Sequence, residues 1–208
     1  YTIFNMKFTI LATILASASA FAPANQKASS TALNADVAKG PYGDALGAQA
    51  PLGFFDPFGM TSAYDEDEFA RIRWVELKHG RVAMLAVVGY LVTYAGVRFP
   101  GAEDIPSGFA ALSATPGMVW AQMAATWALM EAANSNAPGE INGFDPEFKG
   151  DFRNGVLDFG WDKQSDEWKM KKRAIELNNG RAAQMGILGI MVHEKLGNLD
   201  TILPFQGQ

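Results

Sequence analysis

The sequence predicts an all-α membrane protein with three transmembrane helices, the first and third of which cross with pseudo-two-fold symmetry. One segment occurs twice at an offset of 100 residues, and its copies at 71–92 and 171–192 share eight identities. A third apolar stretch, 105–130, carries no charged residue. Loops rich in proline and glycine separate these segments, so three long helices account for most of the chain.

Composition favours one domain and limits the classes of partner. The 208 residues are 49% hydrophobic, which is too apolar for a disordered chain. The net charge of −5 makes nucleic acid an unexpected partner. The chain has no cysteine, so disulfides and thiolate metal sites are excluded. The sequence also lacks a P-loop and a dinucleotide fingerprint, and we do not expect an enzyme.

Residues 1–34 are expected to form a two-part targeting leader. Residues 1–5 precede Met6 and are expected to lie upstream of the true start. Lys7 and the short apolar run after it have the pattern of a signal peptide, and the run is too short to span a membrane. The Ser/Ala-rich segment after Ala20 resembles the transit part of leaders that target plastids bounded by more than two membranes. Residues 35–208 are then the mature three-helix domain.

The first helix is expected from about Tyr64 to Val97. Its predicted N-cap is Thr61 or Ser62, with the acids at 65–68 in the first turn and the Pro-Gly pair at 100–101 ending it. The preceding segment GFFDPFG, at 53–59, is typical of a turn-forming aromatic loop.

The second helix is expected from Pro116 to about Asn134, with proline at its first position. The third is expected to begin after Ser165 as N-cap and to end at Leu196, before Gly197. The apolar tail at 199–205 is expected to lie on a membrane surface. The loop 131–175 holds seven basic residues and 98–116 only one, which places the long loop and the N-terminus on the same side.

Both copies of the repeat contain the motif Glu-x-x-(His/Asn)-Gly-Arg ahead of an apolar run. Its members are Glu76, His79 and Arg81 in the first copy and Glu176, Asn179 and Arg181 in the second. Ionisable groups that lead into an apolar helix are costly unless they are paired. We therefore expect a reciprocal arrangement, in which Arg81 neutralises Glu176 and Arg181 neutralises Glu76.

That arrangement requires the two helices to run parallel and to cross. Gly80 and Gly180, each beside one of the arginines, permit a close approach. A plain structural ion pair is the alternative to a ligand-binding role for these residues.

Carboxylate, imidazole and amide side chains can each give an axial ligand to the Mg²⁺ of a chlorophyll ring. Besides the motif residues, three further candidates lie on the second and third helices: Gln122, Glu131 and His193. Their alternatives are an interhelical hydrogen bond for Gln122, an interfacial carboxylate for Glu131 and a favourable helix-end charge for His193. A ferritin-like di-iron bundle also uses Glu-x-x-His on helices, but the second motif here carries Asn179 instead of histidine.

Together these features resemble the light-harvesting chlorophyll a/b/c-binding superfamily, and most closely the fucoxanthin chlorophyll a/c proteins of diatoms and their relatives. The paired motifs, the three-helix spacing and the loops GFFDPFG and GWDKQSDE carry the resemblance, which covers about 45–205. It implies an antenna protein of the thylakoid membrane that turns over no substrate. The membrane topology implied is multi-pass, with a stromal N-terminus.

The resemblance also implies cofactors, ligands and partners. The cofactors are chlorophyll a, chlorophyll c, fucoxanthin, and diadinoxanthin or a similar xanthophyll. The implied axial ligands are Glu76, His79, Gln122, Glu131, Glu176, Asn179 and His193, with Arg81 and Arg181 compensating charge. The implied carotenoid-site residues are Asp56, Pro57, Trp161 and Asp162. The implied partners are a photosystem core, other antenna subunits and thylakoid lipids, in a homo- or hetero-oligomer.

Two points stay open in this comparison. The green-plant members carry an amide at the position of His193, so the pigment type there is not fixed by the resemblance. A photoprotective member of the same superfamily, which quenches excitation, is the alternative function. Such a member uses acids on the lumenal side, for which the candidates are Glu103, Asp104, Glu194 and Asp200.

Overall fold

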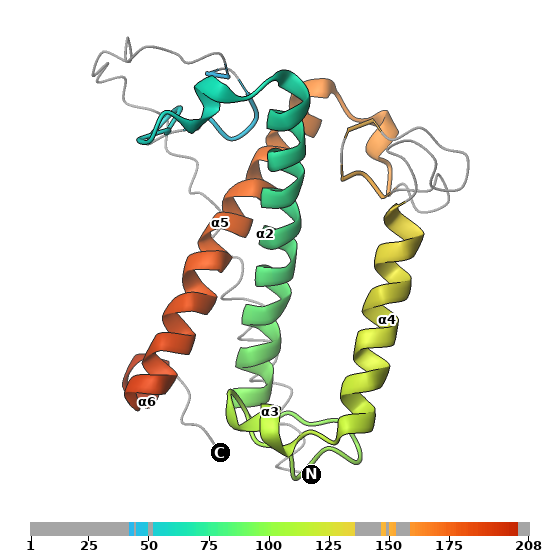
Figure 1. Ribbon diagram of the computed structural model, residues 1–208, viewed down its shortest axis with the longest axis vertical. Helices are drawn as coiled ribbons and strands as arrows, with labels where there is room; N and C mark the ends of the chain where they lie inside the picture. Colours follow the sequence, from blue (N-terminus) through green and yellow to red (C-terminus); the bar gives the residue numbers. More distant parts are fainter. Residues whose placement is uncertain are drawn as a thin grey trace. The chain divides into compact units, whose positions relative to one another are not determined.

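The computed structural model describes residues 42–43, 45–49, 52–135, 147–148, 150–152 and 159–203. The expected leader at 1–34 and the expected domain boundary at 35 lie outside the described residues. Within the described residues all regular structure is helical, apart from one isolated bridge between Gln49 and Gly53 (Figure 1). The predicted all-α class is confirmed.

Three long helices carry most of the described chain. They are α2 (Glu66–Tyr94), α4 (Gly117–Ser135) and α5 (Asp166–Leu196). The shorter elements are η2 (Met60–Ala63), α3 (Ala110–Ala114), η3 (Trp161–Lys163) and α6 (Leu199–Ile202). The long helices lie within three residues of their predicted bounds. The short ones were not predicted, because a single turn between glycines and prolines has no hydrophobic period to detect.

Both ends of α2 differ from the prediction. The carboxylate of Asp65 accepts the backbone N–H of Glu68 at 2.8 Å, so Asp65 caps the helix. The predicted caps, Thr61 and Ser62, lie in η2 instead. At the other end Gly96 adopts φ 81°, and its N–H donates to the Thr93 carbonyl at 3.1 Å. This left-handed glycine ends the helix before the predicted Pro-Gly pair is reached.

The predicted ends of α5 are confirmed. The hydroxyl oxygen of Ser165 lies 3.4 Å from the Trp168 backbone nitrogen. The backbone carbonyl of Ser165 accepts the Lys169 N–H at 3.0 Å. Gly197 has φ 70° and donates to the Glu194 carbonyl, while Asn198 donates to the His193 carbonyl. This pair of bonds is a Schellman motif, which satisfies the last carbonyls of the helix.

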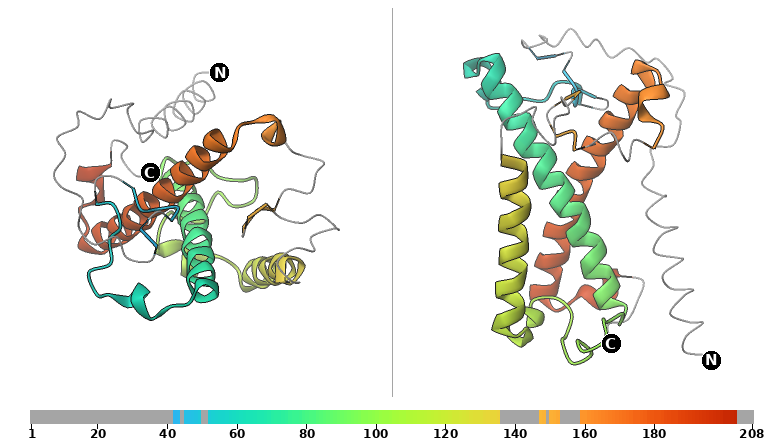
Figure 2. Two further views of the ribbon diagram at one scale, coloured as in Figure 1. Left: turned by 90° about the horizontal axis from the view of Figure 1, so that it is seen from above. Right: turned by 90° about the vertical axis from the view of Figure 1, so that its right-hand side faces the viewer.

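The chain divides into two compact units, each of which takes part of α2 and part of α5. The first unit joins Tyr1–Gly80 to Gln164–Ala182, and the second joins Arg81–Lys163 to Ala183–Gln208. Figure 2 shows α2 and α5 crossing, and in the first unit a β-carbon on Gly180 of α5 would lie 2.9 Å from the Cα of Gly80 of α2. The predicted approach at these two glycines is confirmed.

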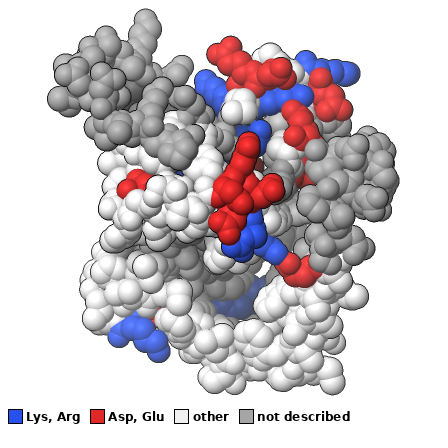
Figure 3. Space-filling view, turned by 45° about the horizontal axis from the view of Figure 1, so that its top comes forward, with Lys and Arg blue, Asp and Glu red and all other residues white. Residues whose placement is uncertain are grey.

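Few apolar side chains are buried among the described residues. Ala83, Tyr94, Leu177 and Leu199 form the core, whereas large side chains along the helices stay exposed, such as Leu129 at 72%. Charged side chains gather on one part of the face shown in Figure 3, and much of the remainder is uncharged. In the part of the chain that the structure describes, no helix combines the length and the apolar character needed to cross a membrane. The three transmembrane helices therefore stay a prediction.

Candidate functional site

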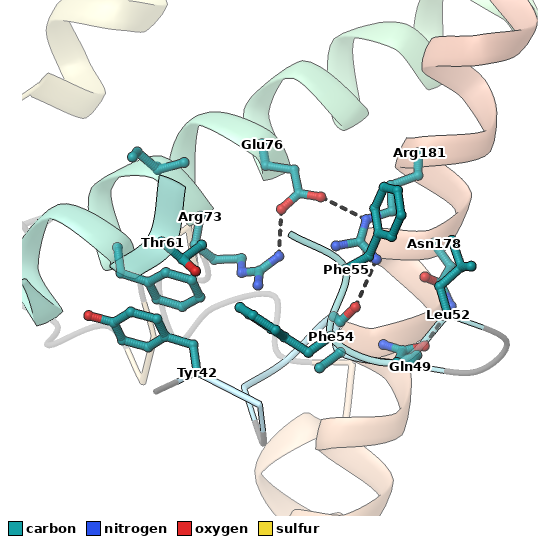
Figure 4. Close-up of a pocket in the computed structure, with 15 residues that line it drawn as sticks. Tyr42, Gln49, Leu52, Phe54, Phe55, Thr61, Arg73, Glu76, Asn178 and Arg181 are labelled. Atoms are coloured by element: carbon teal, nitrogen blue, oxygen red, sulfur yellow. Dashed lines mark hydrogen bonds and ion pairs between the residues drawn. The ribbon is translucent and has the colours of Figure 1, made fainter. Parts of the chain in front are cut away.

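The Glu76 carboxylate lies between two arginines in the first unit. Its Oε1 accepts the Nε–H of Arg181 at 2.7 Å, and its Oε2 accepts from Nη1 of Arg73 at 2.5 Å (Figure 4). The Glu76–Arg181 half of the predicted reciprocal pairing is therefore present. Arg73 was not predicted, although it occurs at the same place in both copies of the repeat.

Two cations face one carboxylate here, so the cluster has one positive charge in excess. Arginine stays protonated in proteins, so both groups keep their charge.

Arg181 has a second partner in the loop before α2. Its Nη1 donates to the Gly47 carbonyl at 2.9 Å. Gly47 is buried and adopts φ 103°, a conformation that L side chains rarely take. A β-carbon on Gly47 would lie 2.6 Å from Leu177 Cδ2 and less than 3 Å from both guanidinium groups. The sequence showed only a glycine-rich segment here, and no signal in it singled out this position.

A pocket of about 470 Å³ opens beside this cluster (Figure 4). Its walls include Leu52, Phe54 and Phe55 from the loop, together with Arg73 and Glu76 from α2. The pocket therefore combines aromatic surface with charged groups, as a site for an amphipathic ring system requires.

Gln49 also lines this pocket and carries an unsatisfied donor. Asn178 donates to its Oε1 at 2.5 Å, which fixes the orientation of the amide. The Nε2 atom is buried and has no hydrogen-bond partner in the described part of the chain. An acceptor oxygen on a bound group would satisfy it, and chlorophylls and fucoxanthin carry such oxygens. The residues present therefore fit a pigment.

The loop after the pocket is fixed by Asp56. Its carboxylate accepts the Met60 N–H at 3.1 Å, the Thr61 N–H at 2.8 Å and the Thr61 hydroxyl at 2.5 Å. The Thr61 hydroxyl and N–H bonds hold the pKa of Asp56 below its ordinary value. Asp56 thus holds its own loop together, and its role and that of Pro57 in a carotenoid site stay predictions.

The corresponding loop before α5 lies in the second unit. The indole Nε1–H of Trp161 donates to Glu147 at 2.8 Å, and its ring centroid lies 6.2 Å from that of Phe148. Trp161 and Asp162 both lie in η3. Their predicted part in a carotenoid site is not tested by these contacts.

Both histidines present one ring nitrogen to an acceptor. His79 Nδ1 lies 2.8 Å from the Val75 carbonyl, and His193 Nδ1 lies 3.0 Å from Asn198 Oδ1. A backbone carbonyl oxygen can only accept, so the contact to Val75 places the proton of the neutral His79 ring on Nδ1 and its lone pair on Nε2. The Asn198 side-chain oxygen favours the same tautomer for His193 in the orientation that the amide adopts. This is the arrangement in which histidine ligates a metal ion.

The remaining predicted residues lie on α4, α5 and α2. Gln122 and Glu131 are exposed on α4, and Glu176 and Asn179 are partly exposed on α5. Arg81 donates to the Gly150 carbonyl at 2.8 Å and lies over the Phe152 ring at 5.5 Å. Its predicted pairing with Glu176 is not tested.

Within the described ranges, no three His, Asp or Glu side chains come close enough to hold a metal ion. A di-iron site needs such a cluster, whereas a ring-bound Mg²⁺ takes a single axial ligand from the protein. The di-iron alternative therefore has no support in these residues.

A second, larger pocket of about 880 Å³ lies in the second unit. Aromatic and aliphatic side chains line it, among them Phe109 and Trp120. Glu194, also in its lining, accepts the Tyr90 hydroxyl at 2.8 Å and the Phe109 N–H at 2.6 Å. Sequence reasoning missed this pocket, because its walls come from α2, α4, α5 and the segment around α3, with no shared motif.

Comparison with known proteins identifies the class to which this fold and site belong. The family model described as chlorophyll A-B binding protein matches residues 42–195, so the chain belongs to that family. It is 53% identical over 200 residues to fucoxanthin-chlorophyll a-c binding protein F, chloroplastic, of Phaeodactylum tricornutum, covering 92% of this chain and 97% of that one.

Relatives from two further organisms agree. The chain is 48% identical to the fucoxanthin-chlorophyll a-c binding protein of Trieres chinensis, over 92% of this chain and 96% of that one. It is 46% identical to fucoxanthin-chlorophyll a-c binding protein A of Macrocystis pyrifera, over 81% of this chain and 79% of that one. The predicted resemblance to fucoxanthin chlorophyll a/c proteins is confirmed.

Proposed function

We propose that the chain is a light-harvesting antenna protein that binds chlorophyll a, chlorophyll c and fucoxanthin. The observation that carries this proposal is the Glu76–Arg181 pair, which lies inside the region matched by the chlorophyll-binding family. The named relatives bind fucoxanthin and chlorophylls a and c. It is not an enzyme, because the family binds pigments and does not turn over a substrate. A further xanthophyll, such as diadinoxanthin, belongs to the same proposal.

The axial ligands that we assign to chlorophyll Mg²⁺ are Glu76, His79, Gln122, Glu131, Glu176, Asn179 and His193. Glu76 shares its charge between the two arginines, and a carboxylate oxygen that accepts a hydrogen bond can also ligate a metal ion. His79 and His193 present Nε2 as the ligand atom. Gln122 and Asn179 offer amide oxygens, and the carboxylates of Glu131 and Glu176 complete the set.

When bound, the pigments absorb light and pass the excitation from one ring to the next, finally to a photosystem. The chain contributes fixed positions. Arg181 holds the Glu76 carboxylate in one orientation, since its Nε is bonded to Glu76 and its Nη1 to Gly47. Aromatic walls such as Phe54 and Phe55 give a ring system an apolar surface to contact beside that carboxylate.

We place α2, α4 and α5 in the thylakoid membrane of a plastid as three transmembrane helices, of which α2 and α5 cross, with the N-terminus on the stromal side. α2 and α5 would be related by a pseudo-two-fold axis, with Arg81 compensating Glu176. The exposed apolar side chains support this placement, for example Leu85 at 74% on α2 and Met185 at 72% on α5. Pigment rings as well as lipid would cover these faces, so the helices need less hydropathy than a bundle without cofactors. Residues 1–34 would be the plastid leader.

The photoprotective alternative has no support in the named relatives. The pKa of Glu103, one of its candidate acids, is also shifted in the opposite direction from the one this role requires. The backbone N–H groups of Glu103 itself and of Gly101 donate to the Glu103 carboxylate and lower its pKa. A sensor of lumenal acidification needs a raised pKa instead.

The test is reconstitution of the full chain with chlorophyll a, chlorophyll c and fucoxanthin, followed by fluorescence. We expect chlorophyll a emission when fucoxanthin alone is excited, because the protein holds both pigments close together. A protein that takes up no pigment, or that emits only when chlorophyll a is excited directly, would overturn the proposal.

A further inference from the structure

We propose that the segment at residues 45–49 is a positioning element for the pigment at Glu76, and that Gly47 is its key residue. This inference rests on the proposed function. The segment reaches the ligand through Arg181, which bonds Glu76 on one side and the Gly47 carbonyl on the other. Gly47 therefore orients the ligand through Arg181.

The space around position 47 does not admit a residue with a side chain. A β-carbon there would lie 2.6 Å from Leu177 Cδ2, 2.8 Å from Arg73 Nη1 and 2.9 Å from Arg181 Nη2. Two of these three atoms belong to the guanidinium groups that hold Glu76. Adding a methyl group to Gly47 must displace at least one of those groups, or the segment itself.

Three further contacts hold the segment and its flank in place. Asn178 on α5 donates to the side chain of Gln49, and the Gly53 N–H donates to the Gln49 carbonyl at 2.8 Å. Tyr42, just before the segment, stacks on Phe69 of α2 with ring centroids 3.8 Å apart. The segment is thus attached to both helices.

A guanidinium is planar and carries its donors in a fixed fork. With Nε on Glu76 and Nη1 on Gly47, the plane of Arg181 is set by two acceptors from different parts of the chain. Loss of the Gly47 acceptor leaves the plane free to turn, and the carboxylate turns with it. A ligand that turns loses the orientation of the ring it holds.

The experiment compares Gly47→Ala with Gly101→Ala in the reconstituted full chain. Gly101 is a matched control, because it also has a left-handed φ, 85°, and a β-carbon there would meet no atom within 4 Å. Glu76→Ala first defines the absorption and circular dichroism bands of the chlorophyll at that site, by difference from the unmodified chain. We expect Gly47→Ala to lose or shift those same bands, and Gly101→Ala to retain them.

The double variant Gly47→Ala, Glu76→Ala separates positioning from general damage. If Gly47 acts only through the Glu76 site, the double variant matches Glu76→Ala in pigment content and spectrum. Additional pigment loss in the double variant, or unchanged Glu76 bands in Gly47→Ala, overturns the inference. If Gly47→Ala takes up no pigment at all, Asn178→Ala decides, since it removes the donor that ties Gln49 to α5 and leaves every residue of the segment in place: a shift of the Glu76 bands supports the inference and an unchanged spectrum overturns it. Failure of the unmodified chain to bind pigment would contradict the proposed function instead.

Discussion

A β-carbon on Gly180 would lie 2.9 Å from the Cα of Gly80, closer than such atoms approach in proteins. The neighbouring atom belongs to the backbone of α2, so it cannot move aside as a side chain can. These two glycines occupy the same place in the two copies of the repeat, one residue before each arginine. They set how closely the helices approach and hence whether Arg181 reaches Glu76.

Gly180→Ala is therefore expected to destabilise the pigmented protein by about 1–3 kcal/mol, the usual cost of inserting a methyl group where nothing can yield. Gly189→Ala is the matched control, because Gly189 lies on the same helix and nothing lies within 4 Å of its β-carbon position. It should be neutral or stabilising by up to about 1 kcal/mol through helix propensity. The measurement is the midpoint of thermal loss of pigment circular dichroism. Equal midpoints for the two variants would contradict the close approach.

Arg181→Leu is expected to weaken pigment binding at Glu76 without abolishing it. The carboxylate keeps Arg73 at 2.5 Å, and its side chain is 28% exposed, so water also screens it. We expect a loss of about 1–2 kcal/mol, which is a five- to thirty-fold weaker site. Titration of bound chlorophyll against protein measures it. Lys171→Leu, which removes an exposed charge from the same helix, should leave binding unchanged.

Arg81→Leu tests the second half of the reciprocal pairing. We expect lower chlorophyll content on reconstitution, because Glu176 would be left without its compensating charge. Arg71→Leu, on an exposed position of the same helix, is the control. Pigment extraction and counting per protein decide the question: unchanged stoichiometry in Arg81→Leu would contradict the pairing with Glu176.

His79→Leu and His79→Asn should differ. Leucine offers no ligand, so the chlorophyll at this position is expected to be lost. Asparagine stands at the equivalent place in the second copy as Asn179, and we expect His79→Asn to keep the chlorophyll. The readout is chlorophyll per protein after extraction. Loss of the chlorophyll in both variants would show that asparagine cannot replace histidine as the ligand in the first motif. Retention of the chlorophyll in both variants would remove His79 from the ligand set.

The loop held by Asp56 is expected to depend on pH in a defined direction. The pKa of Asp56 is lower in the folded chain than its ordinary 3.8, so its contribution to stability is present above 3.8 and is lost as the pH falls through the folded pKa. Asp56→Asn should therefore be less stable than the unmodified chain at neutral pH, and the difference should shrink below 3.8. Unfolding midpoints at several pH values measure this, with Asp67→Asn as control. A difference that persists at the lowest pH would contradict the assignment.

Sequence patterns predicted the helix ends with strong residue preferences and the contact between the two copies of the repeat. Ser165 and Gly197 were found because caps have strong residue preferences, and Glu76 with Arg181 because the duplication implied a reciprocal contact. Asp65 was missed as a cap since Thr61, Ser62 and Asp65 all suit that position, and only the backbone decides among them. Gly96 was passed over for the stronger Pro-Gly signal a few residues later.

The sequence could not show the contacts of the site that form only in the folded chain. Arg73 looked like one of several basic residues, and its contact to Glu76 needs the rotamer as well as the spacing. Gly47 looked like any loop glycine. Its importance comes from Leu177 and Arg181, more than 100 positions away, and no local pattern carries that information.

The bond from Arg181 to Glu76 joins positions 105 residues apart in the chain. In the unfolded chain the two motifs are far apart, and closing so large a loop is slow compared with forming a helix. Arg73, three positions from Glu76, comes beside the acid as soon as α2 forms and can shield it until Arg181 arrives. The difference in sequence separation thus gives the two arginines different roles: one pairs with the acid early in folding, and the other fixes it in the folded protein.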